Sequence, residues 1–301
     1  MERSNWKIEL LMKGTNLIKE NSSIFSGKVP NTLALQFHKK MPNGAALREF
    51  EKKHLHLSYW ETPYYNQAIE RFLKGIDVEH AIIADIGCGD GRFTELLIRL
   101  GFKKIIATDI DLKPIESLEQ HLIETGSLDK VLLINTGVEN LPLKENICDA
   151  VLSIGVLYYL NENYTKGLSE INRIMKKESV LINSEPDLEG ALYKSIFFES
   201  MEDVLQNYFE RYFKEEKGET PYKFRLFTEE EITKILSENG FVIEDKHGLS
   251  LFPSIVRIMM VREQIKQEYL VNNEDKIKII MNYLNENGKL NKHIIWKSKK
   301  K

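Results

Sequence analysis

The feature that most constrains the fold is a strand, a glycine turn and a helix in direct succession. Residues 81–86 (AIIADI) form an apolar run of strand length, and the turn after it contains Gly87, Gly89 and Gly91. The segment RFTELLIRL then has the apolar spacing of a helix and stops at Gly101. Glycines allow positive φ and a close approach to the backbone, and the first N–H groups of a helix lack partners within it. This arrangement predicts a ligand site on bare backbone.

Strand and helix patterns alternate from this turn to about residue 185. The expected strands are 81–86, 104–109, 131–135, 149–154 and about 179–184, and the expected helices are 92–100, 113–125 and 163–177. Such alternation predicts a parallel sheet with right-handed crossovers. In a sheet of this kind ligands bind outside the carboxyl ends of the strands, which is where the glycine turn lies.

The residues around the turn discriminate between ligands. A dinucleotide fold calls for G-x-G-x-x-G, but this chain has G-x-G-x-G, with Arg92 in place of the third glycine. The acidic Asp85 precedes the first glycine by two positions. A carboxylate there would repel a pyrophosphate, whereas it suits a ligand with ammonium and sulfonium charges. These residues argue against a nicotinamide-dependent oxidoreductase, and they leave open a turn that merely connects strand and helix.

With Asp85 and G-x-G-x-G, the chain resembles the class I S-adenosylmethionine-dependent methyltransferases, in particular the small-molecule enzymes of the ubiquinone and menaquinone type (methyltransferase type 11). The resemblance implies an α/β, Rossmann-like sheet of seven mostly parallel strands with helices on both faces. FVIEDKHG and HIIWKSK would be the sixth and seventh strands, the last one antiparallel. The expected organisation is a helical N-terminal lid over residues 1–75 and a methyltransferase domain over 76–301. Helical insertions are expected at about 187–224 and 252–290.

The same resemblance implies where S-adenosylmethionine binds. Asp109 ends the second strand, twenty positions after Gly89, and is expected to accept bonds from both ribose hydroxyls. Asp111 should point the other way on an extended chain. TGVENLP resembles the family's G-D-A-E-x-L-P segment beside adenine, but Gly137 replaces the usual Asp. The cofactor-binding candidates are Asp85, Gly87, Cys88, Gly89, Gly91, Asp109, Ile110, Val138, Glu139, Ser153 and Tyr158.

The acceptor side is less sharply marked. The stretch HLHLSYWETPYYN gathers aromatic residues and two histidines just before the glycine turn, so Tyr59 and Trp60, together with Tyr159, are candidate substrate contacts. Each of them could instead be a packing residue. Methyl transfer is an in-line displacement that needs a general base only where the nucleophile must lose a proton. The candidates for a catalytic role are His56, Glu185 and His247. His38, His80, His121 and His293 have no sequence context that favours a role.

Composition narrows the function further. The chain has 301 residues, a net charge of −3 and a pI of about 6.2, so it has no global basic field for nucleic acid. Its two cysteines, Cys88 and Cys148, provide neither a disulfide framework nor a metal cluster. We therefore expect a cytoplasmic protein without a signal peptide, a membrane span, a metal or a nucleic-acid partner. A small-molecule acceptor is favoured, a homodimer is possible, and an RNA or protein acceptor and a non-catalytic binding module are the alternatives.

Overall fold

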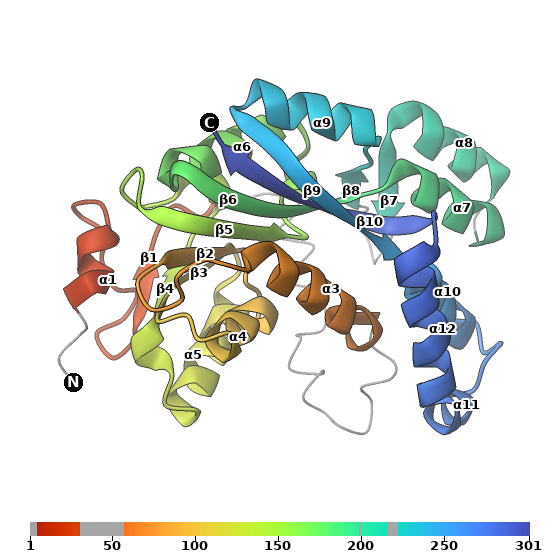
Figure 1. Cartoon of the computed structure of the whole chain (residues 1–301), viewed down its shortest axis with the longest axis horizontal. Helices are drawn as coiled ribbons and strands as arrows, with labels where there is room; N and C mark the ends of the chain where they lie inside the picture. The colour runs from red at the N-terminus through yellow and green to blue at the C-terminus, as the bar shows by residue number, and fades with distance from the viewer. Residues whose placement is uncertain (1–4, 31–56, 199, 216–221) are drawn as a thin grey trace.

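The computed structural model describes residues 5–30, 57–198, 200–215 and 222–301. Within them an eight-stranded sheet has the order β1-β4-β3-β2-β5-β6-β10-β9 (Figure 1). The strands are β1 (Ile24–Ser26), β2 (Ile82–Ile86), β3 (Lys104–Asp109), β4 (Val131–Asn135), β5 (Cys148–Ile154), β6 (Met175–Pro186), β9 (Phe241–Ser250) and β10 (Asn291–Lys300). Only β10 runs antiparallel to its neighbours in this sheet, so the expected mostly parallel architecture is confirmed.

The prediction of seven strands was wrong by one. The additional strand, β1, pairs in parallel with β4 through the register Ile24 to Leu133. It has only three residues, too few for a period-two pattern to stand out in a segment that otherwise reads as helical. Its edge position is decided by pairing with β4, which is information from elsewhere in the chain.

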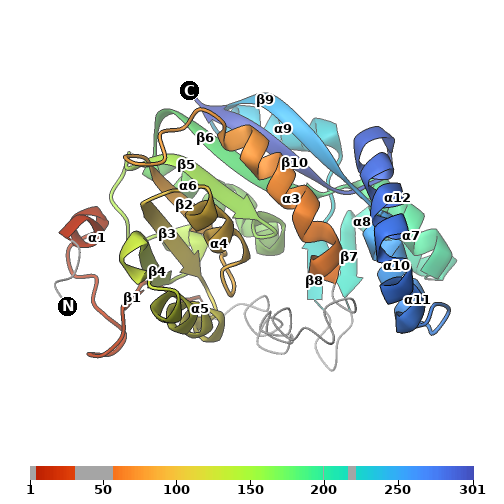
Figure 2. The same ribbon diagram turned by 60° about the horizontal axis from the view of Figure 1, so that its bottom comes forward.

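Helices cover both faces of the sheet, as expected. On one face lie α3 (Leu57–Leu73), α4 (Arg92–Arg99) and α5 (Leu112–Glu124), and on the other lie α6 (Tyr164–Ile174) and α9 (Glu229–Glu238) (Figures 1 and 2). Each face has its own hydrophobic cluster, one built around Ile83, Leu97 and Phe102 and one around Ala84, Leu132 and Ile171. Because both faces are covered, the central strands are apolar throughout rather than alternating.

The two insertions differ in how well the sequence predicted them. The regular elements within residues 252–290 are all helices, as expected. They are α10 (Phe252–Val261), α11 (Gln267–Asn272) and α12 (Glu274–Asn287). The earlier insertion contains α7 (Leu188–Phe198) and α8 (Met201–Glu210), but it then forms the two-stranded ribbon β7 (Tyr212–Glu215) and β8 (Tyr222–Arg225). This ribbon occupies the last part of the insertion expected to be helical at about 187–224, so the expectation is wrong for that part.

The structure describes only part of the N-terminal segment. Helix α1 (Asn5–Leu10) and β1 lie at the outer edge of the sheet beside β4 (Figure 1). Lys7 holds this edge, because its Nζ donates to the carbonyls of Leu128 and Val131 at 2.6 Å each. Residues 31–56, which include the catalytic candidate His56, lie outside the described residues. The role of the 1–75 segment as a lid therefore stays a prediction.

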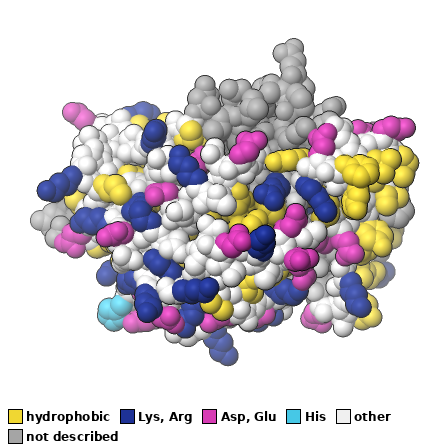
Figure 3. Space-filling model, turned by 90° about the horizontal axis from the view of Figure 1, so that it is seen from above, with side chains coloured by type: hydrophobic (Ala, Val, Ile, Leu, Met, Phe, Trp, Pro, Cys, Tyr) yellow, Lys and Arg dark blue, Asp and Glu magenta, His cyan; other side chains and the backbone are white. Residues whose placement is uncertain are grey.

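One end of the molecule carries an apolar surface. On α7 and α8 six large apolar side chains are exposed, namely Tyr193, Ile196, Met201, Leu205, Tyr208 and Phe209. Figure 3 shows apolar side chains gathered at the right-hand end, where Figure 1 places these helices. The possible homodimer stays a prediction. None of the helices in the described part of the chain is long and apolar enough to cross a membrane.

The burial of Trp60 on α3 generates a prediction about the proposed substrate contacts. Its side chain is 2% exposed and belongs to the core cluster, whereas its neighbour Tyr59 is only half-buried. We expect Trp60→Ala to lower the free energy of unfolding by about 3–5 kcal/mol, because it leaves a cavity in the core. The control Tyr59→Ala should cost about 1 kcal/mol. Urea unfolding measures both, and an unchanged midpoint for Trp60→Ala would contradict a packing role.

Candidate functional site

The glycine turn after β2 is closed from two sides and open above its middle glycine. Gly87 and Cys88 both donate their N–H groups to the Thr108 carbonyl, at 2.7 and 2.9 Å, which ties the turn to β3. A Cβ on Gly87 would stand 2.2 Å from a methyl group of Val156. A Cβ on Gly89, whose φ is +55°, would meet no atom of the described residues within 4 Å. The open side of the turn is therefore the space above Gly89.

Asp109 connects this turn to the end of β3. Its Oδ2 accepts the Gly89 N–H at 2.8 Å and its Oδ1 accepts the Asp111 N–H at 2.8 Å. Both oxygens of this carboxylate therefore act as hydrogen-bond acceptors at the turn. Asp111 points elsewhere, as predicted, because its side chain caps α5 by accepting the Lys113 N–H at 3.2 Å. Asp109 is thus the carboxylate that faces the turn.

Asp85 lies beneath the turn and is almost fully buried, with 1% exposure. Its Oδ2 accepts the Thr94 hydroxyl at 2.6 Å. Burial raises the pKa of Asp85 to about 6, and the neighbouring Asp109 carboxylate raises this pKa further, while the Thr94 bond and Arg92 lower it. The charged form therefore costs free energy in the protein alone. A cation bound at the turn would reduce that cost.

The segment after β4 explains the unusual Gly137. A Cβ at this position would lie 2.7 Å from Cδ of Pro30 and 3.0 Å from Oε2 of Glu139. The chain from the N-terminal segment therefore leaves no room for the Asp that the sequence motif usually carries. Glu139 on the short helix Val138–Asn140 is 6% exposed, and its Oε2 has no hydrogen-bond partner among the described residues. A buried, unpartnered carboxylate oxygen needs a donor such as an exocyclic amino group.

An aromatic cluster stands beyond the end of β5. Tyr158, 5% exposed, lies with its ring centroid 4.4 Å from that of Tyr159, 5.5 Å from Phe224 and 5.6 Å from His293. The His293 Nδ1 in turn is 2.7 Å from the hydroxyl of Tyr65 on α3. Sequence reasoning missed the pairing of His293 with Tyr65, because 228 positions separate them and no local pattern connects them.

The structure places the other predicted residues at varying distances from the turn. Glu185, near the end of β6, lies under α6, where it accepts bonds from the Tyr164 hydroxyl at 2.8 Å and the Asn183 amide at 3.0 Å. Burial raises the pKa of Glu185 to about 8. Ser153 is completely buried, and its hydroxyl has no partner among the residues described. Ile110 directly follows Asp109 at the strand end and is partly buried.

His247 does not share a site with the glycine turn. It lies on β9, and β5, β6 and β10 separate that strand from β2, which amounts to about 19 Å at the usual spacing of strands. Its Nε2 lies 3.0 Å from the amide nitrogen of Asn285. The catalytic role of His247 stays a prediction, because its position near the end of a strand says nothing about how far across the sheet that strand lies.

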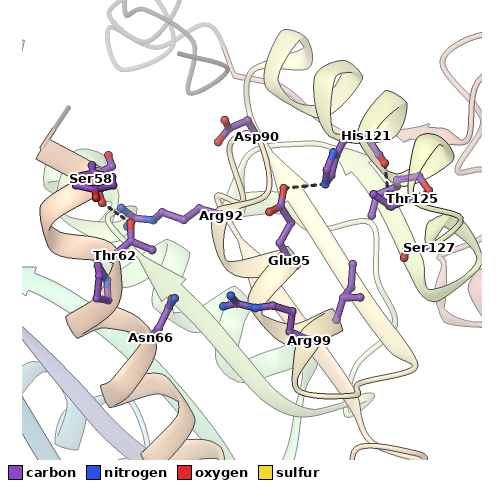
Figure 4. Close-up of a pocket in the computed structure, with 14 residues that line it drawn as sticks. Ser58, Thr62, Asn66, Asp90, Arg92, Glu95, Arg99, His121, Thr125 and Ser127 are labelled. Atoms are coloured by element: carbon purple, nitrogen blue, oxygen red, sulfur yellow. Dashed lines mark hydrogen bonds and ion pairs between the residues drawn. The ribbon is translucent and has the colours of Figure 1, made fainter. Parts of the chain in front are cut away.

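A cavity of about 560 Å³ lies beside the turn, between α3, α4 and α5 (Figure 4). Its walls carry polar side chains from three helices, which include Asn66 from α3, Arg92 and Arg99 from α4, and His121 from α5. The His121 Nε2 lies 3.2 Å from Glu95 Oε1. The cavity adjoins the start of α4 but does not contain Gly89 or Asp109, so it is a neighbour of the candidate ligand site rather than that site.

Comparisons with known proteins agree with this geometry. A family model described as a methyltransferase domain matches residues 84–183. Among curated proteins, the tRNA U34 carboxymethyltransferase of Campylobacter hominis is 27% identical over 150 residues, which cover 45% of this chain and 51% of that protein. The chain spans about half or less of the length of the curated relatives that it matches.

Solved structures share the fold at low sequence identity. A putative S-adenosylmethionine-dependent methyltransferase from Listeria monocytogenes aligns with a TM-score of 0.55 and 14% identity over 79% of this chain and 99% of that one. The [4+2]-cyclase SpnF aligns with a TM-score of 0.53 and 14% identity over 78% of this chain and 81% of that one. This second structure has the same fold but is described as a cyclase. The fold therefore does not identify the reaction, which has to be argued from the site.

The buried Asp85 predicts a stability gain on neutralisation. Because its pKa is raised, the folded protein binds more protons than the unfolded chain between about pH 4 and pH 6, and stability falls as pH rises through this window. At pH 8 the charged form costs about 3 kcal/mol, so Asp85→Asn should be more stable than wild type by up to about that amount. The asparagine keeps an acceptor for Thr94.

Urea unfolding at about pH 5 and about pH 8 measures this difference. The matched control is Asp77→Asn, whose carboxylate is fully exposed and should not give a gain that grows with pH. A wild-type protein that is more stable than Asp85→Asn at the higher pH would show that the Asp85 carboxylate is compensated inside the protein.

Proposed function

Because residues 84–183 form a class I S-adenosylmethionine-dependent methyltransferase domain, we propose that this protein transfers the methyl group of S-adenosylmethionine to an acceptor. The observation that carries the proposal is the Asp109 carboxylate, which accepts the N–H of Gly89, the glycine of the turn whose Cβ position is open among the described residues. The cofactor supplies an activated methyl group, so the protein has to align the acceptor and exclude water. Alignment of this kind contributes roughly 7–11 kcal/mol to catalysis.

The residues present fit this cofactor. Asp109 would accept the ribose hydroxyls, and Ile110 and Val138 would border the adenine ring. The orphaned Oε2 of Glu139 supplies the acceptor that Gly137 cannot. Asp85 gives the methionine end a carboxylate beneath the turn, and Tyr158 offers an aromatic face to a sulfonium. In these proposed roles, the cofactor-binding candidates of the sequence would act together on one ligand.

A small molecule is the acceptor that we favour. The aromatic cluster around Tyr158 and Tyr159 would provide a mostly apolar surface beside the turn, which is typical of small-molecule sites. Basic and acidic side chains alternate on the face shown in Figure 3, without a continuous basic field. Affinity for a phosphate backbone usually requires such a field.

RNA is the second candidate. The relative from Campylobacter hominis is named a tRNA U34 carboxymethyltransferase, so the expectation that no nucleic acid takes part has no support among the relatives. The match covers only 51% of that relative. Binding of tRNA by this chain would therefore need evidence of its own. The two candidates differ in which cell fraction accepts the methyl group.

A direct test combines cofactor binding with transfer. Calorimetric titration should show binding of S-adenosylhomocysteine and no binding of NADH. Tritium from methyl-labelled S-adenosylmethionine should then appear in the small-molecule fraction of a cell extract, rather than in the RNA or protein fraction. Label confined to RNA would select the second candidate, and NADH binding without S-adenosylhomocysteine binding would refute methyl transfer.

Asp109 generates a quantitative prediction. Each hydrogen bond from a ribose hydroxyl to a charged group contributes roughly 1.5–3 kcal/mol, so Asp109→Ala should weaken S-adenosylhomocysteine binding by about one to three decades. Part of this loss comes from the Gly89 N–H, which also loses its partner. The adjacent control Asp111→Ala removes a helix cap but no ribose contact, and should bind within about twofold of wild type. An equal loss in both variants would contradict the ribose role.

A further inference from the structure

His293 occupies a position that the methyl-transfer chemistry can use. Strand β10 is antiparallel to β6, and its start pairs with the end of β6 through the register His293 to Pro186. The beginning of β10 therefore lies at the same sheet edge as the carboxyl ends of the parallel strands. The His293 side chain is 8% exposed and reaches the face of the sheet that α3 and α4 cover, where Tyr65 meets it.

A chain of hydrogen bonds holds the imidazole. The Gly155 N–H donates to the Ser184 hydroxyl oxygen at 3.0 Å. Ser184 is a hydrogen-bond neighbour of Tyr65 that lowers the pKa of the tyrosine. The Tyr65 hydroxyl lies 2.7 Å from Nδ1 of His293. These bonds fix the ring through one nitrogen, and no described residue hydrogen-bonds the other nitrogen, Nε2.

The same group of residues adjoins the cofactor site on two sides. The Tyr65 ring lies 5.6 Å from the ring of Phe93, and the Arg92 guanidinium carbon is 5.0 Å from the Tyr65 ring centroid. Both residues belong to the first turn of α4, directly after the glycine turn. On the other side, Tyr158 touches His293 edge-on. The imidazole is thus placed between the glycine turn and the segment after β5.

The charges around His293 keep it neutral. Burial lowers its pKa well below the usual value, and Lys292, Arg92 and Lys194 lower this pKa further. The other titratable neighbours are Tyr65 and Tyr158, and burial raises the pKa of each phenol, so both stay protonated at neutral pH. In the tautomer that carries its hydrogen on Nδ1, this N–H donates to the Tyr65 hydroxyl oxygen and Nε2 is free to accept a proton.

We propose that His293, oriented by Tyr65 and Ser184, is the general base that takes the proton of a protic methyl acceptor. This assignment rests on the proposed function and deepens it, because it implies an acceptor whose hydroxyl or amine loses its proton during transfer. Tyr65 and Ser184 are positioning residues. The sequence did not predict any of these roles.

The proposed step is balanced in atoms and charge. The acceptor's lone pair forms the new bond to the methyl carbon, and the bond between that carbon and sulfur breaks, with its electron pair going to sulfur. The proton of the acceptor passes to Nε2 of His293, which becomes an imidazolium and later releases the proton to water. The positive charge lost by the sulfonium reappears on the imidazole, so the net charge of the site does not change.

The test compares His293→Gln with the control His80→Gln, which alters an exposed histidine paired with Asp77. We expect His293→Gln to bind S-adenosylhomocysteine within about twofold of wild type. Its transfer to the acceptor fraction identified with labelled cofactor should fall by about a hundredfold or more. Transfer by wild type should decrease on acidification through the imidazole pKa, and this dependence should vanish in His293→Gln. His80→Gln should match wild type throughout.

A second variant and an independent readout guard against misfolding. Tyr65→Phe keeps the packing of the ring and the imidazole. It should lower the rate of transfer by about tenfold and shift the pH at which this rate decreases on acidification. NMR titration of the seven histidines should show a ring, absent in His293→Gln, that stays neutral at about pH 5, where an unperturbed imidazole is charged. Transfer by folded His293→Gln at the wild-type rate with the wild-type pH profile, or a charged His293 ring at pH 7, would overturn the assignment. Failure of wild type to bind S-adenosylhomocysteine would overturn it together with the proposed function.

Discussion

The hydrogen bond from the Gly89 N–H to Asp109 Oδ2, 2.8 Å long, is the interaction on which the candidate site depends. It joins the turn after β2 to the end of β3, and the Thr108 carbonyl reinforces the same junction by accepting from Gly87 and Cys88. The turn is thereby held without any side chain of the described residues within 4 Å of the Cβ position at Gly89. A ligand that lies there meets a preformed surface, so less of its binding free energy is spent on ordering the loop.

Two buried carboxyl groups show that the site is not optimised for stability. Asp85 is 1% exposed and Glu185 is 2% exposed, and burial raises the pKa of each. Neither has a salt-bridge partner in the described part of the chain, so each is held only by hydrogen bonds from neutral groups. Uncompensated carboxyls of this kind concentrate at functional sites, where the ligand provides the missing charge or donor.

The direction of β10 decides what stands at the carboxyl edge of the sheet. An antiparallel strand begins where its parallel neighbours end, so its first residues reach the ligand side. This brings His293 within 2.7 Å of Tyr65 and beside Tyr158. The chain therefore gathers the side chains that we propose for the acceptor side from α3, the segment after β5, and the start of β10, which are far apart in sequence.

The sequence by itself determined the strand, turn and helix around Gly89, the carboxylate at Asp109, the alternation of strands and helices, and the methyltransferase resemblance, because all of these depend on local patterns. Only the tertiary structure decided the eighth strand, the distance between His247 and the turn, and the pairing of Tyr65 with His293. It also decided why position 137 carries glycine, since Pro30 fills the space that a side chain would need. Each of these depends on which distant segments pack together, and periodicity along one segment contains no information about that.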